Sequence, residues 1–331
     1  MQVFDLMAGF VYSQVLLACV QLRLFERLHQ GGPQPLAVLA PQLGLDAAAA
    51  ERLLRAAVAL RLLSLRSGGC YGLGPLGAPL VGEPGLLAMI EHHRHLYADL
   101  ADPLARLQAA PGGGDLARFW AYARAERPGG LAAADVADYS ALMAASQTLV
   151  APQVLAAYPL HRHRCLLDVG GGEGAFACAA AQAVPHLQVQ VFDLPGVAER
   201  ARSRLASAGL SGRSRVHGGD FLREPLPPGA DLITLLRIVH DHDDAAVMQL
   251  LRAVRAALAP GGCLLLAEPL AHTPGAERVG DAYFGWYLMA MGQGQARSEA
   301  RLRQMLADAG FARTRRCATP LPLQASVLVA W

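Results

Sequence analysis

The residues with the most specific chemistry form a glycine-rich segment, LLDVGGGEGAF at 166–176. Gly170, Gly172 and Gly174 carry no β-carbon, so the backbone there can turn sharply out of a strand and lie against a ligand. With Ala175 the segment also fits the G-x-G-x-x-A form of the dinucleotide fingerprint. The glycines therefore indicate a nucleoside cofactor, and alone they leave open whether it is a nicotinamide dinucleotide or S-adenosylmethionine.

Two acids follow this segment at the spacing of further strands. Asp193 ends the apolar run 187–192, and Asp220 follows the glycine pair 218–219. In an adenosine-binding sheet, a carboxylate after the second strand can accept hydrogen bonds from both ribose hydroxyls, and one after the third can hold the adenine amine. Each acid alone is also explained as a helix or turn cap. Their order behind the glycines, with a long helical region in front, favours S-adenosylmethionine.

The elements that must position these residues change in type along the chain. From residue 165 onward, short apolar runs alternate with helical stretches, which is typical of a parallel sheet with helical crossovers. The expected strands cover residues 165–169, 187–192, 231–239, 263–267, 313–317 and 325–330. The cofactor glycines and acids then follow the ends of successive strands.

The first half of the chain has helical spacing of apolar residues, beginning at 4–28. Two further helices joined at Gly44, the second capped by Asp46, predict a helix-turn-helix. The segment 63–73 carries Gly68 and Gly69 between apolar flanks, which predicts a small hairpin. Together these features indicate a winged helix.

Composition limits the classes of function. The 331 residues favour two units, and no stretch of 18 uncharged apolar residues or signal peptide is evident, so we expect a soluble, cytoplasmic protein. The net charge of +2 is spread without a basic block, which argues against nucleic acid as the main partner. Six cysteines without CxxC or zinc spacing indicate reduced thiols and no metal site.

Several longer motifs carry a family resemblance over nearly the whole chain. The sequence resembles the small-molecule O-methyltransferases that use S-adenosylmethionine, a family that includes plant phenolic and hydroxyindole enzymes. The motifs are DVGGGEG (168–174), VFDLPGV (191–197), GGDFL (218–222), HDHDD (240–244), LAPGGCLLLAEP (258–269) and RSEARLRQMLADAGF (297–311). The resemblance implies S-adenosylmethionine as cofactor.

Within that family the chain is most similar to bacterial carotenoid O-methyltransferases of the hydroxyneurosporene and demethylspheroidene type. This likeness rests on YGLGPLGAPL (71–80), MIEHHRHLYADLADP (89–103), YSALMAASQ (139–147) and GDAYFGWYLMAMGQG (280–294). It implies an α/β fold: a class I Rossmann-like methyltransferase sheet, mostly parallel with an antiparallel last strand, after a mainly helical winged-helix domain that forms a homodimer. The expected divisions are 1–105 for dimerisation, 106–160 for a helical linker at the acceptor pocket, and 161–331 for the cofactor domain.

The resemblance also implies roles for individual side chains. Asp168, Leu194, Phe221 and Leu236 are expected to complete the cofactor site around the glycines, Asp193 and Asp220. Tyr139, Met143, Trp286 and Met289 fall in segments that line the acceptor pocket in relatives, and aromatic and thioether side chains suit a long apolar ligand. Each of these four is equally explained as ordinary core. The implied acceptor is the tertiary 1-hydroxyl of an acyclic carotenoid.

The general base implied by the resemblance is His240, which opens the HDHDD run. Here His242 replaces a tryptophan common in the family, so two imidazoles are candidates, and we favour His240. Of the two carboxylates that assist the base in plant members, Glu268 is kept, while Ala296 stands where the other is expected. Because an aliphatic alcohol is a weak acid, we expect its proton to leave late in methyl transfer.

Other functions remain open from the sequence. Relatives with this fold that hydroxylate or decarboxylate, O-methyltransferases of phenolic, phenazine or polyketide compounds, and C-methyltransferases of chlorophyll-type rings are the alternatives among enzymes. The helix-turn-helix also raises a DNA-binding regulator, although Arg52 and Arg55 are the only cations on its expected recognition helix. For a carotenoid acceptor, peripheral contact with the inner membrane is a further hypothesis.

Overall fold

The computed structural model describes residues 2–110, 112–120, 122, 133–319 and 325–331. The chain separates into two compact units, Met1–Arg94 and His95–Trp331. The boundaries at residues 105 and 160 that we expect from the sequence remain a prediction. Each unit has its own hydrophobic core.

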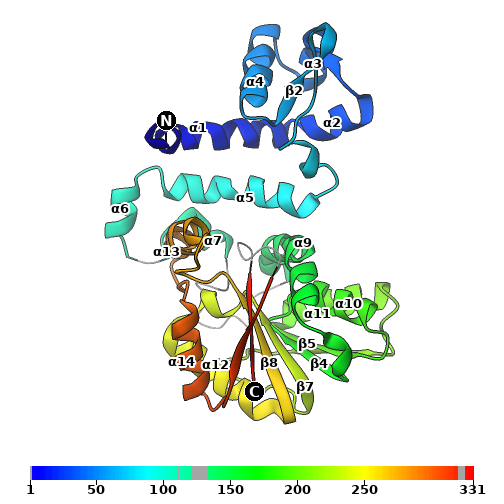
Figure 1. Ribbon diagram of the computed structural model, residues 1–331, viewed down its shortest axis with the longest axis vertical. Helices are drawn as coiled ribbons and strands as arrows, with labels where there is room; N and C mark the ends of the chain where they lie inside the picture. The colour runs from blue at the N-terminus through cyan, green and yellow to red at the C-terminus, as the bar shows by residue number, and fades with distance from the viewer. Residues whose placement is uncertain (1, 111, 121, 123–132, 320–324) are drawn as a thin grey trace. The chain divides into compact units, whose positions relative to one another are not determined.

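The first unit consists of helices and a small sheet (Figure 1). Its elements are α1 (Gln2–Gln21), α2 (Leu24–Gly31), β1 (Gln34–Pro35), α3 (Leu36–Leu43), α4 (Ala47–Ala59), β2 (Leu63–Leu65), η1 (Ser67–Gly69), β3 (Cys70–Leu73) and η2 (Ala78–Leu80), and α5 (Pro84–Asp99) crosses into the second unit. The helix expected over 4–28 is interrupted at Arg23, whose left-handed φ of 53° ends α1 and begins α2.

Local sequence accounts for the winged-helix pattern of this unit. Gly44 adopts a left-handed φ of 67° after α3, and the side chain of Asp46 accepts a 2.7 Å hydrogen bond from the Ala49 amide at the start of α4. The strands β2 and β3 pair antiparallel, with Gly68 and Gly69 at positive φ between them, and β1 joins the other side of β3. The predicted helix-turn-helix and hairpin are therefore present.

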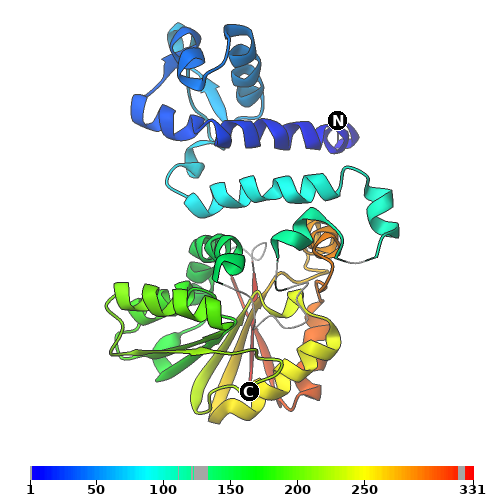
Figure 2. The same cartoon turned by 180° about the vertical axis from the view of Figure 1, so that it is seen from behind.

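The second unit is a seven-stranded sheet covered by helices on both faces (Figures 1 and 2). Its helical elements are α6 (Pro103–Gln108), α7 (Asp115–Phe119), α9 (Ala133–Ala157), η4 (Leu160–Arg162), α10 (Ala175–Ala183), α11 (Pro195–Ser207), η5 (Val239–Asp241), α12 (Asp244–Ala257), η6 (Arg278–Tyr283), α13 (Phe284–Met291) and α14 (Glu299–Asp308). Its strands are β4 (Cys165–Val169), β5 (Gln188–Asp193), β6 (Ser214–Gly218), β7 (Ala230–Leu236), β8 (Leu258–Glu268), β9 (Thr314–Cys317) and β10 (Ser326–Ala330).

The sheet has the order β6-β5-β4-β7-β8-β10-β9, in which β10 runs antiparallel to both β8 and β9 while the other pairs are parallel. This confirms the predicted mostly parallel sheet with an antiparallel last strand. The strand expected over 231–239 ends at Leu236, because Arg237 takes a left-handed φ of 60° and η5 begins at Val239. The chain thus turns off the sheet just before His240.

Alternating side chains divide the core between the two faces of the sheet. Leu166 and Leu265 pack with α9, α10 and α11, whereas the next residues, Leu167 and Leu266, pack with α12 and α14. Successive side chains of a strand point to opposite faces, so each central strand supplies both cores. This double burial fixes the strand register, and with it the edge at which the carboxyl ends of β4, β5 and β7 meet.

Candidate active site

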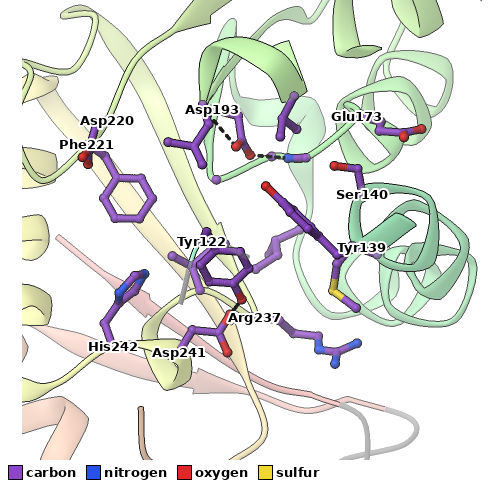
Figure 3. A pocket seen from close by; sticks show the side chains of 18 of the residues that line it. Tyr122, Tyr139, Ser140, Glu173, Asp193, Asp220, Phe221, Arg237, Asp241 and His242 are labelled. Atoms are coloured by element: carbon purple, nitrogen blue, oxygen red, sulfur yellow. Dashed lines mark hydrogen bonds between the residues drawn. The ribbon is translucent and has the colours of Figure 1, made fainter. Parts of the chain in front are cut away.

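A cavity of about 550 Å³ opens at that edge of the sheet (Figure 3). It lies wholly within the second unit and is formed by the segments that follow β4, β5, β6 and β7 together with α9. The lining includes these predicted site residues: Tyr139, Met143, Gly170, Gly172, Asp193, Leu194, Asp220, Phe221, Leu236 and His242. The crevice outside the carboxyl ends of parallel strands is the usual ligand position in such sheets.

The glycine-rich segment forms the floor beside α10. Gly170 and Gly172 have φ angles of 66° and 57°, in the region that favours glycine. A β-carbon on Gly170 would lie 2.4 Å from Ile238 Cδ1, whereas one on Gly172 would meet no atom within 4 Å. Gly174 has a φ of 74° and precedes α10, where it faces Val191 and does not line the cavity. The loop thus brings bare backbone to the cavity at Gly170 and Gly172.

Asp193 is held at the end of β5 by the same loop. Its carboxylate accepts 2.7 Å hydrogen bonds from the amides of Gly172 and Leu194 (Figure 3). Burial raises the pKa of Asp193 to about 6, although these two amides act in the opposite direction. The fixed carboxylate still has lone pairs that can accept from hydroxyl groups in the cavity.

Asp168, on β4, lies outside the cavity and next to this arrangement. It is buried, does not line the cavity, and accepts a 2.6 Å hydrogen bond from the hydroxyl of Thr234. Burial raises its pKa to about 7; the Thr234 hydrogen bond opposes that rise, and the charge of Asp193 adds to it. Two carboxyl groups whose pKa values are raised by burial therefore lie beside the glycine-rich loop.

Asp220 and Phe221 lie at another side of the cavity, after β6. The Asp220 carboxylate accepts from the Leu222 amide at 3.0 Å and lies 3.4 Å from Arg223 Nε. Phe221 contacts the ring of His242 in a perpendicular arrangement, with 5.5 Å between the ring centroids. Leu194 and Leu236 add apolar wall, so this side offers the acid and flat apolar surfaces that suit an adenine ring.

His240 is enclosed between two carboxylates. Its Nδ1 lies 2.6 Å from Glu268 Oε2, and its Nε2 lies 3.1 Å from Asp241 Oδ1. Glu268 Oε1 accepts from the amides of Ile238 and Val239 at 2.9 and 2.7 Å, which ties the end of β8 to the turn after β7. Burial alone would lower the pKa of His240, but Asp241 and Glu268 outweigh it and raise that pKa.

The neighbours of His240 in the chain, and not His240 itself, line the cavity. Asp241 Oδ2 accepts a 2.8 Å hydrogen bond from the hydroxyl of Tyr122, and His242 presents its ring beside Phe221 (Figure 3). Burial lowers the pKa of His242, which favours its neutral form. Sequence reasoning singled out His240 and His242 but passed over the acid between them.

Arg297 fixes the turn that carries these three residues. Its buried guanidinium donates to the carbonyls of Val239 and His242, both at 2.7 Å, and to the carboxylate of Asp244 at 2.8 Å. The Gln295 amide also donates to the His240 carbonyl at 2.8 Å. The segment before α14 therefore holds the turn rigidly, although Ala296 within it contributes no carboxylate.

The four predicted acceptor residues are not all in one place. Tyr139 and Met143, on α9, line the cavity, whereas Met289 borders a separate cavity of about 290 Å³ that also contains Ala296. Trp286 is 37% exposed on α13 and lines neither cavity. The two α9 residues are thus the ones that the structure brings to the cavity lined by the predicted cofactor residues.

Tyr122 and Arg237 also line the cavity and were missed by sequence reasoning. Arg237 follows β7 and stands out only in the structure, by its left-handed φ. Tyr122 lies far from every motif, and no sequence signal marks it. Both reach the cavity through packing of distant segments, so periodicity could not have found them.

Buried polar atoms on α9 test whether the cavity fits S-adenosylmethionine. Tyr139 Oη, Ser140 Oγ and Gln147 Oε1 are buried without a hydrogen-bond partner among the described residues, and all three residues line the cavity. A buried polar atom without a hydrogen-bond partner costs folding free energy unless a ligand or a water molecule supplies the hydrogen bond. They line the same cavity as the glycine-rich loop, and two hydroxyl groups and an amide oxygen fit a ligand that carries amino and carboxyl groups, as S-adenosylmethionine does.

Two family models match the chain. Residues 127–312 match the O-methyltransferase domain, and residues 4–83 match the O-methyltransferase dimerisation domain. The winged-helix unit therefore belongs to a dimerisation domain, which supports a homodimer and removes the ground for a DNA-binding regulator.

Relatives agree in sequence over nearly the full length. A demethylspheroidene O-methyltransferase of Cereibacter sphaeroides is 44% identical over 311 residues, covering 94% of this chain and 81% of that protein. Its counterpart from Rhodobacter capsulatus is 42% identical over 335 residues, covering 99% and 81%. Sequence identity of this size over this share of both chains shows that this protein and the two relatives belong to the same family.

Solved structures share the fold. Human N-acetylserotonin methyltransferase in complex with S-adenosylmethionine superposes with a TM-score of 0.82 at 24% identity, covering 99% of this chain and 96% of that chain. The S-adenosylmethionine-dependent methyltransferase SibL gives a TM-score of 0.81 at 27% identity, covering 100% and 98%. The chain belongs to the S-adenosylmethionine-dependent O-methyltransferase family and uses S-adenosylmethionine as its cofactor.

Proposed function

We propose that this enzyme methylates the tertiary 1-hydroxyl of an acyclic carotenoid. The observation that carries the proposal is the 44% identity, over 94% of the chain, to a protein named demethylspheroidene O-methyltransferase. Met143 and Ala144, two apolar residues of α9 that line the cavity, are compatible with one end of a hydrocarbon chain.

In this proposal the glycine side of the cavity holds the cofactor. Gly170 and Gly172 leave room for it, Asp193 accepts from the ribose hydroxyls, and Asp220 accepts from the adenine amine, with Leu194, Phe221 and Leu236 against the ring. Bound S-adenosylmethionine supplies a methyl group on a sulfonium, which is transferred by in-line displacement. The residues of the chain have to align the acceptor oxygen and exclude water.

Tyr139 and Met143 are proposed to contact the acceptor near its hydroxyl, and Trp286 and Met289 to contact more distant parts of the polyene. Met143 offers adaptable apolar area, because its thioether side chain has several accessible rotamers. Proton removal is assigned to the turn after β7, where His240, Asp241 and His242 lie above Glu268. This cluster combines bases with a rigid support from Glu268 and Arg297.

We propose a cytoplasmic homodimer that touches the inner membrane peripherally. The apolar acceptor dissolves in the bilayer, so an enzyme that approaches the lipid surface would meet it there. Two described helices, α1 and residues 139–157 of α9, are long and apolar enough to cross a membrane by composition, but α9 contributes Val150 and Val154 to the core and α1 belongs to the dimerisation match. Flotation with liposomes, with and without hydroxycarotenoid, tests the contact, and absence of binding in both cases would refute it.

The acceptor is tested by incubating the purified enzyme with labelled S-adenosylmethionine and a panel of acceptors. The panel contains 1-hydroxycarotenoids, simple phenols, a phenazine and a chlorophyll precursor. We expect label transfer to hydroxycarotenoids, with the product retaining its polyene absorption. Transfer to phenols alone, while cofactor binding is intact, would overturn the carotenoid acceptor without affecting the family assignment.

A further inference from the structure

We propose that Glu173 is a positioning residue for cofactor binding, because its buried carboxylate fastens the glycine-rich loop to α11 and so fixes the loop amide that holds Asp193. Placing the ribose hydroxyls at Asp193 is part of the proposed function, and the inference rests on it in this respect. It is carried by two ion pairs of Glu173 and by the packing of the loop on α11.

Glu173 is the one charged residue in the glycine run 170–174, and its side chain is 8% exposed. Its Oε1 accepts a 2.5 Å hydrogen bond from Arg200 Nε, and its Oε2 accepts a 2.8 Å hydrogen bond from Arg204 Nη2. A carboxylate that is withdrawn from water to this extent needs charged donors of this kind, because an unpaired buried charge is strongly destabilising. Both oxygens of Glu173 are thus committed to α11.

Arg200 and Arg204 lie about one turn apart on α11, so their side chains reach the same face of that helix. Their side chains are 36% and 43% exposed, and Glu173 is the only hydrogen-bond acceptor of either guanidinium among the residues that the structure describes. Without the carboxylate, two like charges would face each other across this turn, which is unfavourable. Glu173 therefore offsets part of this charge and holds both side chains in place.

The loop and α11 also touch through apolar groups. Gly174 has a left-handed φ of 74°, and a β-carbon on it would lie 3.5 Å from Val191 and 3.6 Å from both Ala201 and Leu205. Ala201 and Leu205 each follow one of the two arginines in sequence, so this contact uses the same stretch of α11 as the ion pairs. The ion pairs therefore fasten the loop where it already packs against the helix.

Asp193 is joined to the same loop at the residue before Glu173. Its carboxylate accepts the 2.7 Å hydrogen bond from the Gly172 amide, and Asp193 itself ends β5 just before α11 begins at Pro195. In Figure 3 the Glu173 carboxylate is directed away from Asp193, whose own hydrogen bonds are dashed. The loop is therefore held at two points, by α11 through Glu173 and by β5 through Asp193, and the direction of the Gly172 amide depends on both.

A side-chain clamp matters here because every other residue of the run 170–174 is glycine. Glycine samples more backbone conformations than other residues, so ordering such a loop around a ligand costs conformational entropy. Glu173 orders the loop in the free protein, and cofactor binding then does not bear that cost. We therefore expect loss of the clamp to weaken S-adenosylmethionine binding more than it slows methyl transfer from the bound cofactor.

The first experiment measures the affinity for S-adenosylmethionine by isothermal titration calorimetry in E173Q, R204Q and the double variant. E173Q keeps the size of the side chain but removes its charge, so the dissociation constant should rise roughly tenfold. R204Q should weaken binding in the same direction, and the double variant should bind no more weakly than E173Q, because both substitutions remove the same clamp. In steady-state kinetics the loss should appear mainly in the KM for S-adenosylmethionine rather than in kcat. The matched control is E199Q, which breaks the exposed pair of Glu199 and Arg202 on the same helix and should leave the affinity unchanged.

The second experiment follows the loop itself by NMR in the cofactor-free protein, isotope-labelled at its glycines. The Gly172 amide, which donates to Asp193, should exchange with solvent faster in E173Q than in the wild type. The Gly229 amide, which donates to the Ala257 carbonyl at 2.9 Å, is the internal reference. A general loss of stability would speed exchange at both amides, whereas release of the clamp affects Gly172 alone.

The inference is wrong if E173Q binds S-adenosylmethionine as tightly as the wild type, or if its Gly172 amide stays equally protected. Additive losses of affinity in the double variant would also overturn it, because Glu173 and Arg204 would then act separately. If E173Q loosens Gly172 and weakens binding while D193A keeps its affinity, the clamp is confirmed and the ribose placement of the proposed function is wrong. The identity of the acceptor changes neither result, since titration and exchange need no acceptor.

Discussion

The two sides of the cavity are built in different ways. The side proposed for the cofactor consists of backbone amides and short side chains that follow consecutive strands, such as Gly172 and Asp193, which are hydrogen-bonded to each other. The side proposed for the acceptor consists of side chains from segments far apart, such as Tyr122 and Asp241, which are 119 residues apart in sequence. The first kind of site depends on local geometry, and the second depends on how the elements pack.

The largest expected effect is a loss of cofactor affinity on the side of the cavity proposed for the cofactor. D193A removes the carboxylate proposed to accept from the ribose hydroxyls, so S-adenosylmethionine should bind about 100-fold more weakly, as expected for lost hydrogen bonds to a charged group. Isothermal titration calorimetry measures this. The matched control is D46A, which removes an acid that caps α4 in the other unit. D46A should leave cofactor affinity unchanged, and equal losses in both variants would argue against a role of Asp193 in the site.

On the acceptor side, E268Q should lower kcat by roughly 10-fold to 100-fold, because His240 loses the charge of its Nδ1 partner. Cofactor affinity should change little, since Glu268 does not line the cavity. Steady-state kinetics at saturating S-adenosylmethionine separate kcat from KM. A variant with normal kcat would show that the pair of His240 and Glu268 has no part in proton handling.

The pH dependence of cofactor binding is a further test of the role proposed for Asp193. Because burial raises the pKa of Asp193 to about 6, the free protein loses this acceptor as pH falls through 6, and binding should weaken by roughly tenfold per pH unit below it. The same shift affects folding. Because burial raises the pKa of Asp193 from its usual 3.8 to about 6, the free energy of unfolding of the free protein falls as the pH rises through this range. D193N should flatten the binding profile between pH 5 and about 6. Asp168, with a pKa of about 7, titrates next to it and would account for any dependence that D193N retains.

The smallest expected effect concerns the apolar wall. M143A should raise the acceptor KM by roughly fivefold, corresponding to about 1 kcal/mol of lost apolar contact, while M143L should stay close to the wild type. Cofactor affinity should be unaffected in both. If M143A leaves the acceptor KM unchanged, Met143 belongs to the helical core rather than to the acceptor contact.

Most of the fold was predictable because its signals are local. The alternation of apolar runs and helical stretches from Cys165 onward, and the caps at Gly44 and Asp46, report backbone hydrogen bonds and burial that neighbouring residues decide. The end of β7 was less predictable: the apolar run continues to Val239, but the strand stops at Leu236 because Arg237 adopts a left-handed φ. That turn is set by the contacts of the Glu268 carboxylate with the Ile238 and Val239 amides.

By itself the sequence predicted a nucleoside cofactor beside Gly170, Gly172 and Asp193, because the glycines and the acid follow successive predicted strands in the order of an adenosine-binding sheet. It also brought His240 and Glu268 to one edge of the sheet. Only the tertiary structure decided that His240 faces Asp241 and Glu268 instead of the cavity, and that Tyr122 meets Asp241. Side-chain orientation depends on contacts between elements that are distant in sequence, and no periodicity records those contacts.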